Sequence, residues 1–179
     1  MRQVVLYMGM SLDGYIADGW GKVDWMTGQD PDCDAQGTYE NFIKKVDTVV
    51  MGWNTYHQIV SKLSPQEWVY RGMETYVVTH REEKNKEEIL FTDQEPCELV
   101  RQLKEKPGKT IWICGGAQLV QQLMSEDLID RYHISILPII LGGGIFLFGG
   151  ERARHRKMEL KLVHTESQNG IVDVVYEHR

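Results

Sequence analysis

The sequence lacks the features that mark a membrane protein or a disulfide framework. None of its apolar runs reaches the length of about 18 residues that a membrane-spanning helix needs. The first segment becomes polar before a secretory signal could be complete. The cysteines are odd in number, far apart and outside any C-x-x-C spacing, namely Cys33, Cys97 and Cys114. We therefore expect a cytoplasmic protein with reduced thiols and no membrane partner.

Metal-binding motifs and an excess of basic residues are also missing. The six histidines form no H-x-x-x-H or H-x-x-E-H pair, so we predict no metal. Twenty basic against 26 acidic residues give a formal charge of -6, which opposes nucleic-acid binding. The basic run at residues 152–157 (RARHRK) is expected to be a solvated loop, with a phosphate-bearing ligand as the alternative.

What the sequence does contain is a regular alternation of apolar strands and amphipathic helices. The length of 179 residues predicts a single domain, residues 1–179. Short apolar runs at 4–10, 48–51, 76–79, 89–91 and 110–114 alternate with helical stripes at 39–46, 56–60, 99–103 and 119–124. This order predicts parallel strands with right-handed crossovers. The expected fold class is α/β, with three layers and helices on both faces of a mostly parallel central sheet.

The last third of the chain has a different pattern. Residues 132–136 alternate between apolar and polar, and strand-like segments at 158–163 and 171–176 flank the tight-turn pair Asn169-Gly170. We therefore expect a C-terminal antiparallel hairpin. Residues 14–25 mix turn formers with aromatic residues and are expected to form a long ordered loop, not a regular helix or strand.

Two strand ends carry glycines that could hold phosphate. Gly115 and Gly116 follow one strand and open a helix, and Gly52 does the same after another. A plain strand-to-helix turn has the same pattern, and the full G-x-G-x-x-G motif is missing, which disfavours an ordinary Rossmann domain. A third strand ends in Thr79, His80 and Arg81, which could bind a 2'-phosphate or form a polar loop.

Five segments in this order resemble the dihydrofolate reductase superfamily over about the whole chain: VVLYMGMSLDGYIA, VDTVVMGWNTYHQI, YVVTHR, IWICGGAQLVQQLM and ISILPIILGGGIFLF. The SLDG motif, and Pro138 followed by LGGG and FLF, resemble the riboflavin-biosynthesis deaminase-reductase C-terminal (reductase) domain and its stand-alone homologues more than dihydrofolate reductase itself. The resemblance implies an NADPH-dependent oxidoreductase.

The resemblance also implies which residues bind NADPH. Contacts to the nicotinamide are implied for Ile16 and Ala17, and contacts to the phosphates for Gly52, Trp53, Asn54, Thr55, Gly115, Gly116, Ala117, Gln118 and Leu119. Thr79, His80 and Arg81 match the loop near the 2'-phosphate. A basic residue is usual at the place of Trp53 and frequent at that of Gln118, which leaves the preference for NADPH over NADH open. Arg81 and His80 could compensate.

On the substrate side, dihydrofolate reductase uses a buried acid on the first helix to hold the pteridine ring. Here Asp34 and Glu40 both lie near that place, and Gln36 is nearer by count, so dihydrofolate is not the expected substrate. Ser135 matches a strand that offers a hydroxyl to the substrate. Trp25, Tyr39 and Phe42 could wall a flat heterocycle or could be core residues. Asp13 and Asp24 flank the nicotinamide loop and are the candidate catalytic acids, with turn stabilisation as the alternative.

The function expected from these residues is hydride transfer from NADPH to a pyrimidine- or pteridine-like heterocycle, of the 5-amino-6-(5-phosphoribosylamino)uracil reductase type. The alternatives are dihydrofolate reductase activity and a non-catalytic NADPH- or folate-binding protein. Riboflavin-type relatives pair through their C-terminal region, so we also expect a homodimer. The apolar segment 138–148 would need cover at a surface, although its glycines could instead form a tight bend over the cleft.

Overall fold

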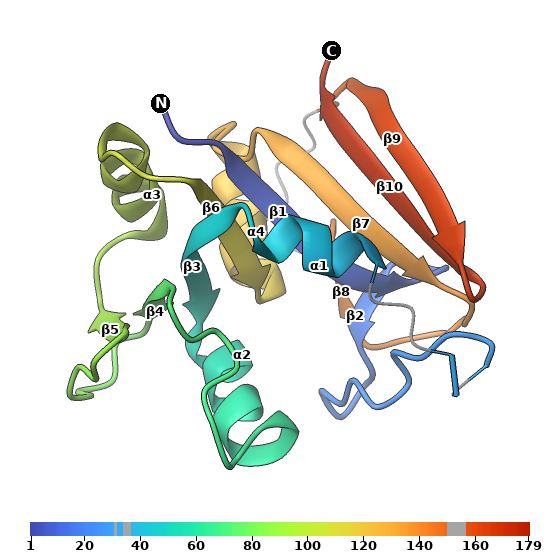
Figure 1. Cartoon of the computed structure of the whole chain (residues 1–179), viewed down its shortest axis with the longest axis horizontal. Coiled ribbons are helices and arrows are strands. Elements are labelled where there is room, and N and C mark those ends of the chain that lie inside the picture. Colours follow the sequence, from blue (N-terminus) through green and yellow to red (C-terminus); the bar gives the residue numbers. More distant parts are fainter. Residues whose placement is uncertain (31, 34–36, 150–156) are drawn as a thin grey trace.

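The computed structural model describes residues 1–30, 32–33, 37–149 and 157–179. Its centre is an eight-stranded sheet with the strand order β5-β4-β3-β6-β1-β7-β10-β9. The strands are β1 (Val4–Ser11), β3 (Val46–Gly52), β4 (Glu74–Val78), β5 (Ile89–Thr92), β6 (Thr110–Gly115), β7 (Arg131–Leu137), β9 (Leu160–Gln168) and β10 (Ile171–His178). In this order, the strands β5, β4, β3, β6, β1 and β7 run parallel to one another. Strand β10 is antiparallel to both β7 and β9. The predicted parallel sheet with a C-terminal antiparallel hairpin is confirmed (Figure 1).

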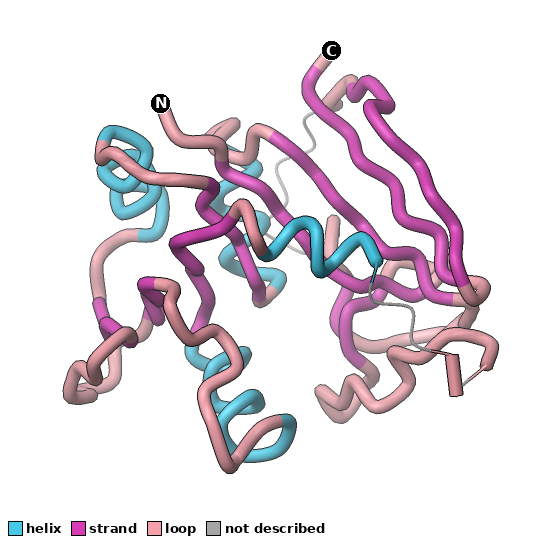
Figure 2. Tube along the Cα trace, viewed as in Figure 1, coloured by secondary structure: helices cyan, strands magenta, loops and turns pink. Residues whose placement is uncertain are grey.

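Helices cover both faces of this sheet, as the sequence predicted. The helices are α1 (Gly37–Ile43), α2 (Trp53–Gln58), which continues into the π-helical turn η1 (Ile59–Leu63), α3 (Pro96–Glu105) and α4 (Ala117–Ser125). On one face, Phe42 of α1 and Tyr56 of α2 belong to the same apolar cluster as Trp112 of β6. On the other face, Leu103 of α3 and Leu123 of α4 pack with neighbouring strand residues. Figure 2 shows the strands as one twisted sheet between the helices.

The sheet changes winding direction between β3 and β6. The chain passes from β3 into α2 on one face, whereas it passes from the adjacent β6 into α4 on the opposite face. Because β3 and β6 are parallel neighbours, with Met51 opposite Gly115, both helices begin at the same edge of the sheet. In open α/β sheets such a switch point leaves a crevice at the carboxyl ends of the strands, where ligands bind.

The expectation of an irregular loop at residues 14–25 is wrong for three of them. Tyr15–Ala17 form β2, which pairs antiparallel with β8 (Ile145–Phe146). The pairing was not visible in the sequence because its partner lies more than a hundred residues later. Gly144 permits it: its φ is +133°, and a Cβ there would lie 2.1 Å from the Ala17 carbonyl oxygen.

The C-terminal hairpin turn is confirmed. Asn169 and Gly170 both have positive φ, 52° and 76°, as a type I′ turn requires of its two central residues. Asn and Gly adopt this conformation more readily than other residues, which is why this pair signals a tight hairpin. Within the described part of the chain, no helix combines the length and apolar character needed to cross a membrane.

Candidate functional site

The N-termini of α2 and α4, each preceded by a glycine, lie next to each other at the switch point. Gly52 precedes α2 and Gly116 precedes α4, and neither helix has a side-chain hydrogen bond capping its first N–H groups. A Cβ added at Gly52 would lie 3.8 Å from the Gly116 nitrogen. Both glycines have negative φ, -83° and -88°, so neither position needs a backbone conformation reserved for glycine. Paired uncapped helix ends fit an anionic group that bridges them.

Thr55 and Gly115 complete this edge. The Thr55 hydroxyl would lie 3.6 Å from a Cβ at Gly116 and 3.4 Å from one at Gly115, so α2 directs this side chain toward the start of α4. Gly115 has a φ of +129°, and a Cβ there would collide with Met8 at 2.8 Å. The expected phosphate segments after β3 and β6 are therefore brought together.

The remaining residues of these two segments differ in exposure. Asn54 and Gln118 are exposed, so both side chains are accessible at the helix starts. Ala117 and Leu119 are buried, and Leu119 belongs to the core beneath α4. Any contact that Leu119 makes with a cofactor is therefore restricted to its backbone.

Arg81, in the predicted 2'-phosphate segment, lies against the ring of Trp53, in the predicted phosphate segment after β3. The Arg81 guanidinium lies 5.0 Å from the centroid of the Trp53 ring. The Thr79 hydroxyl accepts a hydrogen bond from the Arg81 nitrogen at 3.1 Å, which shapes the turn after β4. Thr79 is buried, whereas His80 and Arg81 are exposed. A positive charge thus stands beside Trp53.

Asp13 connects the first loop to the glycine-rich segment. Its carboxylate accepts hydrogen bonds from the Ser11 hydroxyl at 2.7 Å, from the Leu141 nitrogen at 3.1 Å and from the Gly142 nitrogen at 2.7 Å. Desolvation raises the pKa of Asp13, but these hydrogen bonds outweigh it and the pKa is lowered overall. Such a carboxylate is an anchor held in its ionised form, so its position favours the turn-stabilising alternative over proton donation.

The other residues expected around the nicotinamide lie on β2 and the loop after it. Ile16 and Ala17 are on β2, and Ala17 is buried. Asp24 is exposed, and the Trp25 indole donates to the Lys22 carbonyl at 3.0 Å. The next residue, Met26, places its sulfur 3.3 Å from where a Cβ of Gly9 would be, so this loop covers β1.

The substrate residues expected on α1 differ in how deeply they are buried. Phe42 is buried and packs edge-on against Trp112 with ring centroids 5.6 Å apart, which favours the core alternative. Tyr39 is half-buried, 6.0 Å from the same ring, and burial raises its pKa to about 12. Glu40 is exposed. Asp34 and most of the basic run at 152–157 lie outside the described residues.

A buried carboxylate that the sequence reasoning missed lies on β10. Asp173 is 8% exposed and accepts hydrogen bonds from the hydroxyls of Ser135 and of Thr38, the latter at 2.8 Å. Burial raises its pKa, but the nearby His133 side chain and the hydrogen bonds from Ser135 and Thr38 outweigh burial and lower it overall. The available signal was a single acid inside the apolar strand IVDVVY, because a lone charge in such a run needs a specific partner.

The hydroxyls around Asp173 extend to Tyr7 on β1. The Tyr7 hydroxyl lies 3.2 Å from the Thr38 hydroxyl, and its ring lies 4.0 Å from the His133 ring. Ser135 was an expected substrate residue, and the structure places it directly opposite Gly9 and Asp173 in the sheet register. This Asp173 cluster (Tyr7, Thr38, His133, Ser135 and Asp173) therefore lies on the face that α1 covers.

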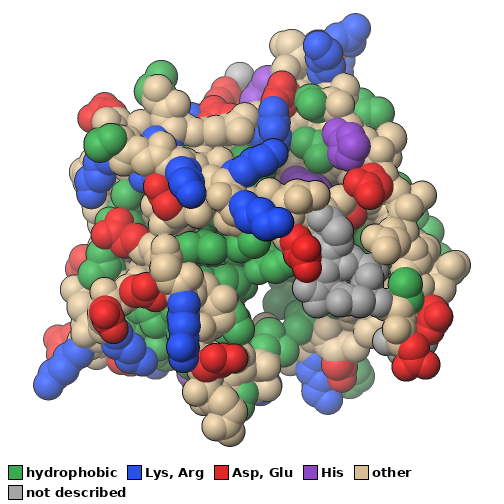
Figure 3. Space-filling model, viewed as in Figure 1, with side chains coloured by type: hydrophobic (Ala, Val, Ile, Leu, Met, Phe, Trp, Pro, Cys, Tyr) green, Lys and Arg blue, Asp and Glu red, His purple; other side chains and the backbone are tan. Residues whose placement is uncertain are grey.

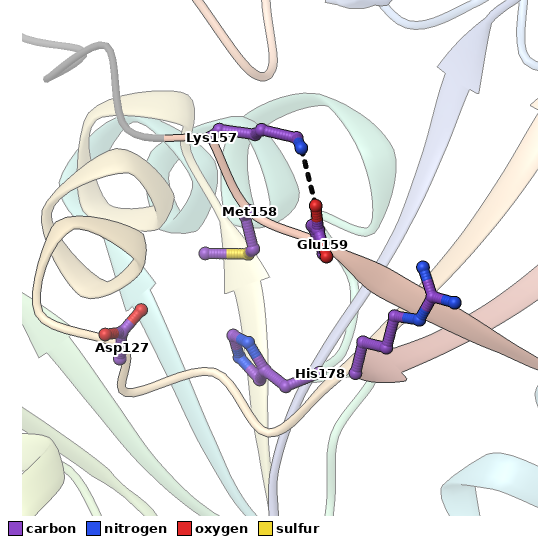
Figure 4. A pocket seen from close by; sticks show the side chains of 6 residues that line it. Asp127, Lys157, Met158, Glu159 and His178 are labelled. Atoms are coloured by element: carbon purple, nitrogen blue, oxygen red, sulfur yellow. Dashed lines mark hydrogen bonds and ion pairs between the residues drawn. The ribbon is translucent and has the colours of Figure 1, made fainter.

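Figure 3 shows the face that carries α1 and α2 hollowed near its centre, with hydrophobic side chains in the hollow. A second hollow, drawn in Figure 4, lies at the opposite edge of the sheet and is lined by Asp127, Lys157, Met158, Glu159, His178 and Arg179. It is next to the carboxyl end of antiparallel β10, far from the glycine ends along the strands. We therefore keep it outside the candidate site.

Comparison with known proteins gives a consistent result. The family model of the RibD C-terminal domain matches residues 2–176. Two uncharacterized proteins of Bacillus subtilis (strain 168) are similar along their length. YwjB is 36% identical over 161 residues, covering 89% of this chain and 90% of YwjB. YyaP is 30% identical over 185 residues, covering 98% of this chain and 94% of YyaP.

Solved structures share the fold. A protein from Shewanella sp. PV-4, whose name refers to riboflavin biosynthesis, has a TM-score of 0.82 and 26% identity, with 99% of each chain covered. A Thermotoga maritima diaminohydroxyphosphoribosylaminopyrimidine deaminase/5-amino-6-(5-phosphoribosylamino)uracil reductase has a TM-score of 0.74 and 18% identity. The likeness covers 99% of this chain but 57% of the Thermotoga chain.

Proposed function

Because the chain belongs to the RibD C-terminal domain family, we propose that it is an NADPH-dependent reductase that transfers a hydride to a pyrimidine-like heterocycle. The substrate would be of the class reduced by 5-amino-6-(5-phosphoribosylamino)uracil reductases, the activity that the name of the Thermotoga maritima relative prints. Dihydrofolate reduction and binding without turnover are the outcomes that would replace this proposal. The cytoplasmic location stays a prediction.

The observation that carries the proposal is the pair of helix starts at Gly52 and Gly116. A dinucleotide has two phosphates that need N–H donors close together, and a Cβ at Gly52 would stand 3.8 Å from the Gly116 nitrogen, inside that space. The residues present therefore fit the pyrophosphate of a nicotinamide dinucleotide. The side chains of Thr55 and Gln118 would add hydrogen bonds there.

The proposed preference for NADPH rests on Arg81. Its guanidinium is exposed and held beside Trp53 at 5.0 Å, at the carboxyl end of β4, the neighbour of β3. A guanidinium binds a phosphate monoester through charge-assisted hydrogen bonds, and NADPH carries such a group where NADH has a hydroxyl.

When bound, NADPH would supply the hydride, and the chain would supply position, shelter from water and a path for the proton. The segment at Ile16 and Ala17 is fixed by β8, and the loop carrying Trp25 and Met26 lies over β1. These elements would hold the nicotinamide and the heterocycle against each other. Asp24 is an exposed acid near this loop and remains the candidate for returning a proton from solvent.

The test combines a binding measurement with a turnover measurement. Purified protein is titrated with NADPH and NADH by fluorescence. NADPH absorbance at 340 nm is then followed with 5-amino-6-(5-phosphoribosylamino)uracil, with the diaminohydroxyphosphoribosylaminopyrimidine from which deamination forms it, and with dihydrofolate. We expect tighter binding of NADPH than of NADH, and oxidation with the pyrimidine. Binding of NADPH without consumption on any compound would replace the enzyme by a binding protein, and no binding would reject the proposal.

We further propose that the protein is a homodimer that uses the segment at 138–148. Gly142 and Gly144 have φ of 70° and 133°, so the predicted tight bend forms, and it leaves Ile140, Ile145, Phe146 and Phe148 between 39% and 69% exposed. An apolar cluster of this kind on a surface is typical of a contact site. Light scattering on Ile140→Ser should show a weaker dimer, with Leu63→Ser, at another exposed apolar residue, as the control. A monomeric wild-type protein would contradict the proposal.

A further inference from the structure

The turn of the C-terminal hairpin is hydrogen-bonded to the loop that follows β2. The Asn169 side chain accepts a hydrogen bond from the Asp30 nitrogen at 2.8 Å and donates one to the Asp30 carbonyl at 2.8 Å. The Asn169 carbonyl accepts a third bond, from the Gln29 nitrogen at 2.9 Å. Asp30 and Asn169 are 139 positions apart in the sequence, and Figure 1 shows the turn between β9 and β10 beside this loop.

Close packing accompanies these hydrogen bonds. A Cβ added at Gly28 would lie 2.3 Å from the Asn169 Nδ2, and one added at Gly170 would lie 2.4 Å from the Gln29 Cγ. A glycine on each side therefore lets the loop and the turn approach more closely than side chains would allow. The two segments fit each other and are not merely neighbours.

The turn itself does not need the side-chain amide of Asn169. Its two central residues need positive φ, which glycine adopts even more readily than asparagine. Both side-chain hydrogen bonds that Asn169 makes among the described residues go to Asp30. An amide offers a donor and an acceptor at once, so it can pair with both backbone groups of one residue. What this side chain contributes is therefore attachment of the loop.

The attached loop covers β1 at the proposed nicotinamide site. The Met26 sulfur lies 3.3 Å from where a Cβ of Gly9 would be. Gln29 follows Met26 by three residues, at most about 10 Å of extended chain, so attachment at Gln29 limits where Met26 can lie. Toward its other end the loop is held to α2 by the hydrogen bond from Gln58 Nε2 to the Gly21 carbonyl at 2.8 Å. The covering segment thus runs between two attachments.

We propose that Asn169 is a positioning residue whose side-chain amide holds this loop, so that Trp25 and Met26 stay over β1 at the nicotinamide end of the site. The inference rests on the proposed function and adds a residue that acts on it through the loop. A loosened loop would admit water and misplace the reacting groups, and a displacement of about 1 Å can lower a rate about a hundred-fold. The phosphates of NADPH would bind at Gly52 and Gly116, on other strands, so cofactor affinity should depend little on Asn169.

The experiment removes the amide and keeps the turn. Asn169→Gly retains positive φ without strain and loses both hydrogen bonds to Asp30. We expect amide hydrogen exchange of Asp30, followed by NMR, to become at least about ten-fold faster. With 5-amino-6-(5-phosphoribosylamino)uracil, kcat should fall at least about ten-fold, while the Kd for NADPH stays within about two-fold. Asn85→Gly is the matched control, since Asn85 also accepts a backbone hydrogen bond, from Phe91 at 2.9 Å, six residues along the chain.

A second variant reaches the same contact from the side of the loop. Gly28→Ala keeps Asn169 and places a Cβ 2.3 Å from its Nδ2, so the loop and the turn must separate. The Asp30 amide should again exchange faster, and kcat should again fall more than the affinity for NADPH. This variant keeps the inference testable if Asn169→Gly does not fold.

The pattern across these measurements separates positioning from a purely structural role. An Asp30 amide that stays protected in Asn169→Gly, or one that is freed without loss of kcat, overturns the inference. Faster exchange throughout the core strands, with kcat and stability lost together, makes Asn169 a structural residue only and also overturns it. A wild-type protein that consumes no NADPH rejects the proposed function instead, and the exchange of Asp30 then still decides whether Asn169 holds the loop.

Discussion

The carboxylate of Asp13 accepts a hydrogen bond from the backbone nitrogen of Gly142 at 2.7 Å, across 129 residues of sequence. Together with the bond from Leu141, it joins the loop before β2 to the glycine-rich segment before β8. The short strand pair that presents Ile16 and Ala17 therefore depends on an anchor at its base.

Asp13→Asn should disturb this anchor, because an amide cannot accept from both backbone nitrogens. We expect kcat/KM of the proposed reaction to fall by about ten- to a hundred-fold through misplacement of β2. The Kd for NADPH should change little, because its phosphates would bind at Gly52 and Gly116. Asp18→Asn is the matched control, since its carboxylate accepts hydrogen bonds from the Trp20 and Lys22 nitrogens of its own turn. Equal effects of the two substitutions on steady-state kinetics would argue against a special role for Asp13.

Gly52→Ala tests the pyrophosphate cradle. The φ of -83° is compatible with alanine, and the nearest atom to the new Cβ is Gly116 N at 3.8 Å, so the fold should be kept or slightly stabilised. The methyl group would nevertheless occupy the space between the helix ends. We expect NADPH affinity to fall by about ten-fold or more in fluorescence titrations, roughly the loss of one charge-assisted hydrogen bond. Gly143→Ala, where the Cβ meets open space, is the control.

Arg81→Gln tests the preference between the two nicotinamide dinucleotides. Removing the guanidinium next to Trp53 should weaken NADPH by about ten- to a hundred-fold, as one charged hydrogen-bond partner contributes about 1.5–3 kcal/mol. NADH lacks the 2'-phosphate and should bind as before. The measurement is the ratio of the two Kd values, at two salt concentrations. A variant that weakens both cofactors equally would place Arg81 elsewhere on the ligand.

The pKa of Asp173 predicts how stability depends on pH. The folded-state pKa is lowered from the ordinary value of 3.8, so the carboxylate contributes stability that is fully present above that value. This stability is lost as the pH falls through the lowered folded-state pKa. We expect Asp173→Asn to lose less stability than wild type when urea unfolding is moved from about pH 6 to about pH 3. Parallel losses in the two proteins would mean that Asp173 is not held ionised.

Features that depend on neighbouring residues could be predicted from the sequence. The strands ending at Gly52 and Gly115 are apolar runs followed by glycine and a helical stripe, so each strand, turn and helix was visible locally. Their meeting also followed, because parallel strands place their carboxyl ends at one edge. The hairpin turn was predictable from Asn169-Gly170, the pair that the turn conformation favours.

Features that depend on distant pairing could not be predicted. The partners of Asp13 lie 128 and 129 residues away, and those of Asp173 lie on α1 and β7. Which side chain meets Asp173 is set by strand register, and a shift of one residue would turn it to the other face. The same holds for β2, whose partner β8 is two residues long and has no strand pattern of its own.

The place of β1 in the sheet has a consequence for how the molecule assembles. Its two hydrogen-bonding neighbours are β6 and β7, so β1 has no partner during synthesis until residues 110–137 have followed it. Pairings of such long sequence separation close slowly, and the apolar edge of β1 is exposed to other chains in the meantime. Chaperone dependence during synthesis, and refolding slower than a helical protein of this length, are therefore expected of this topology.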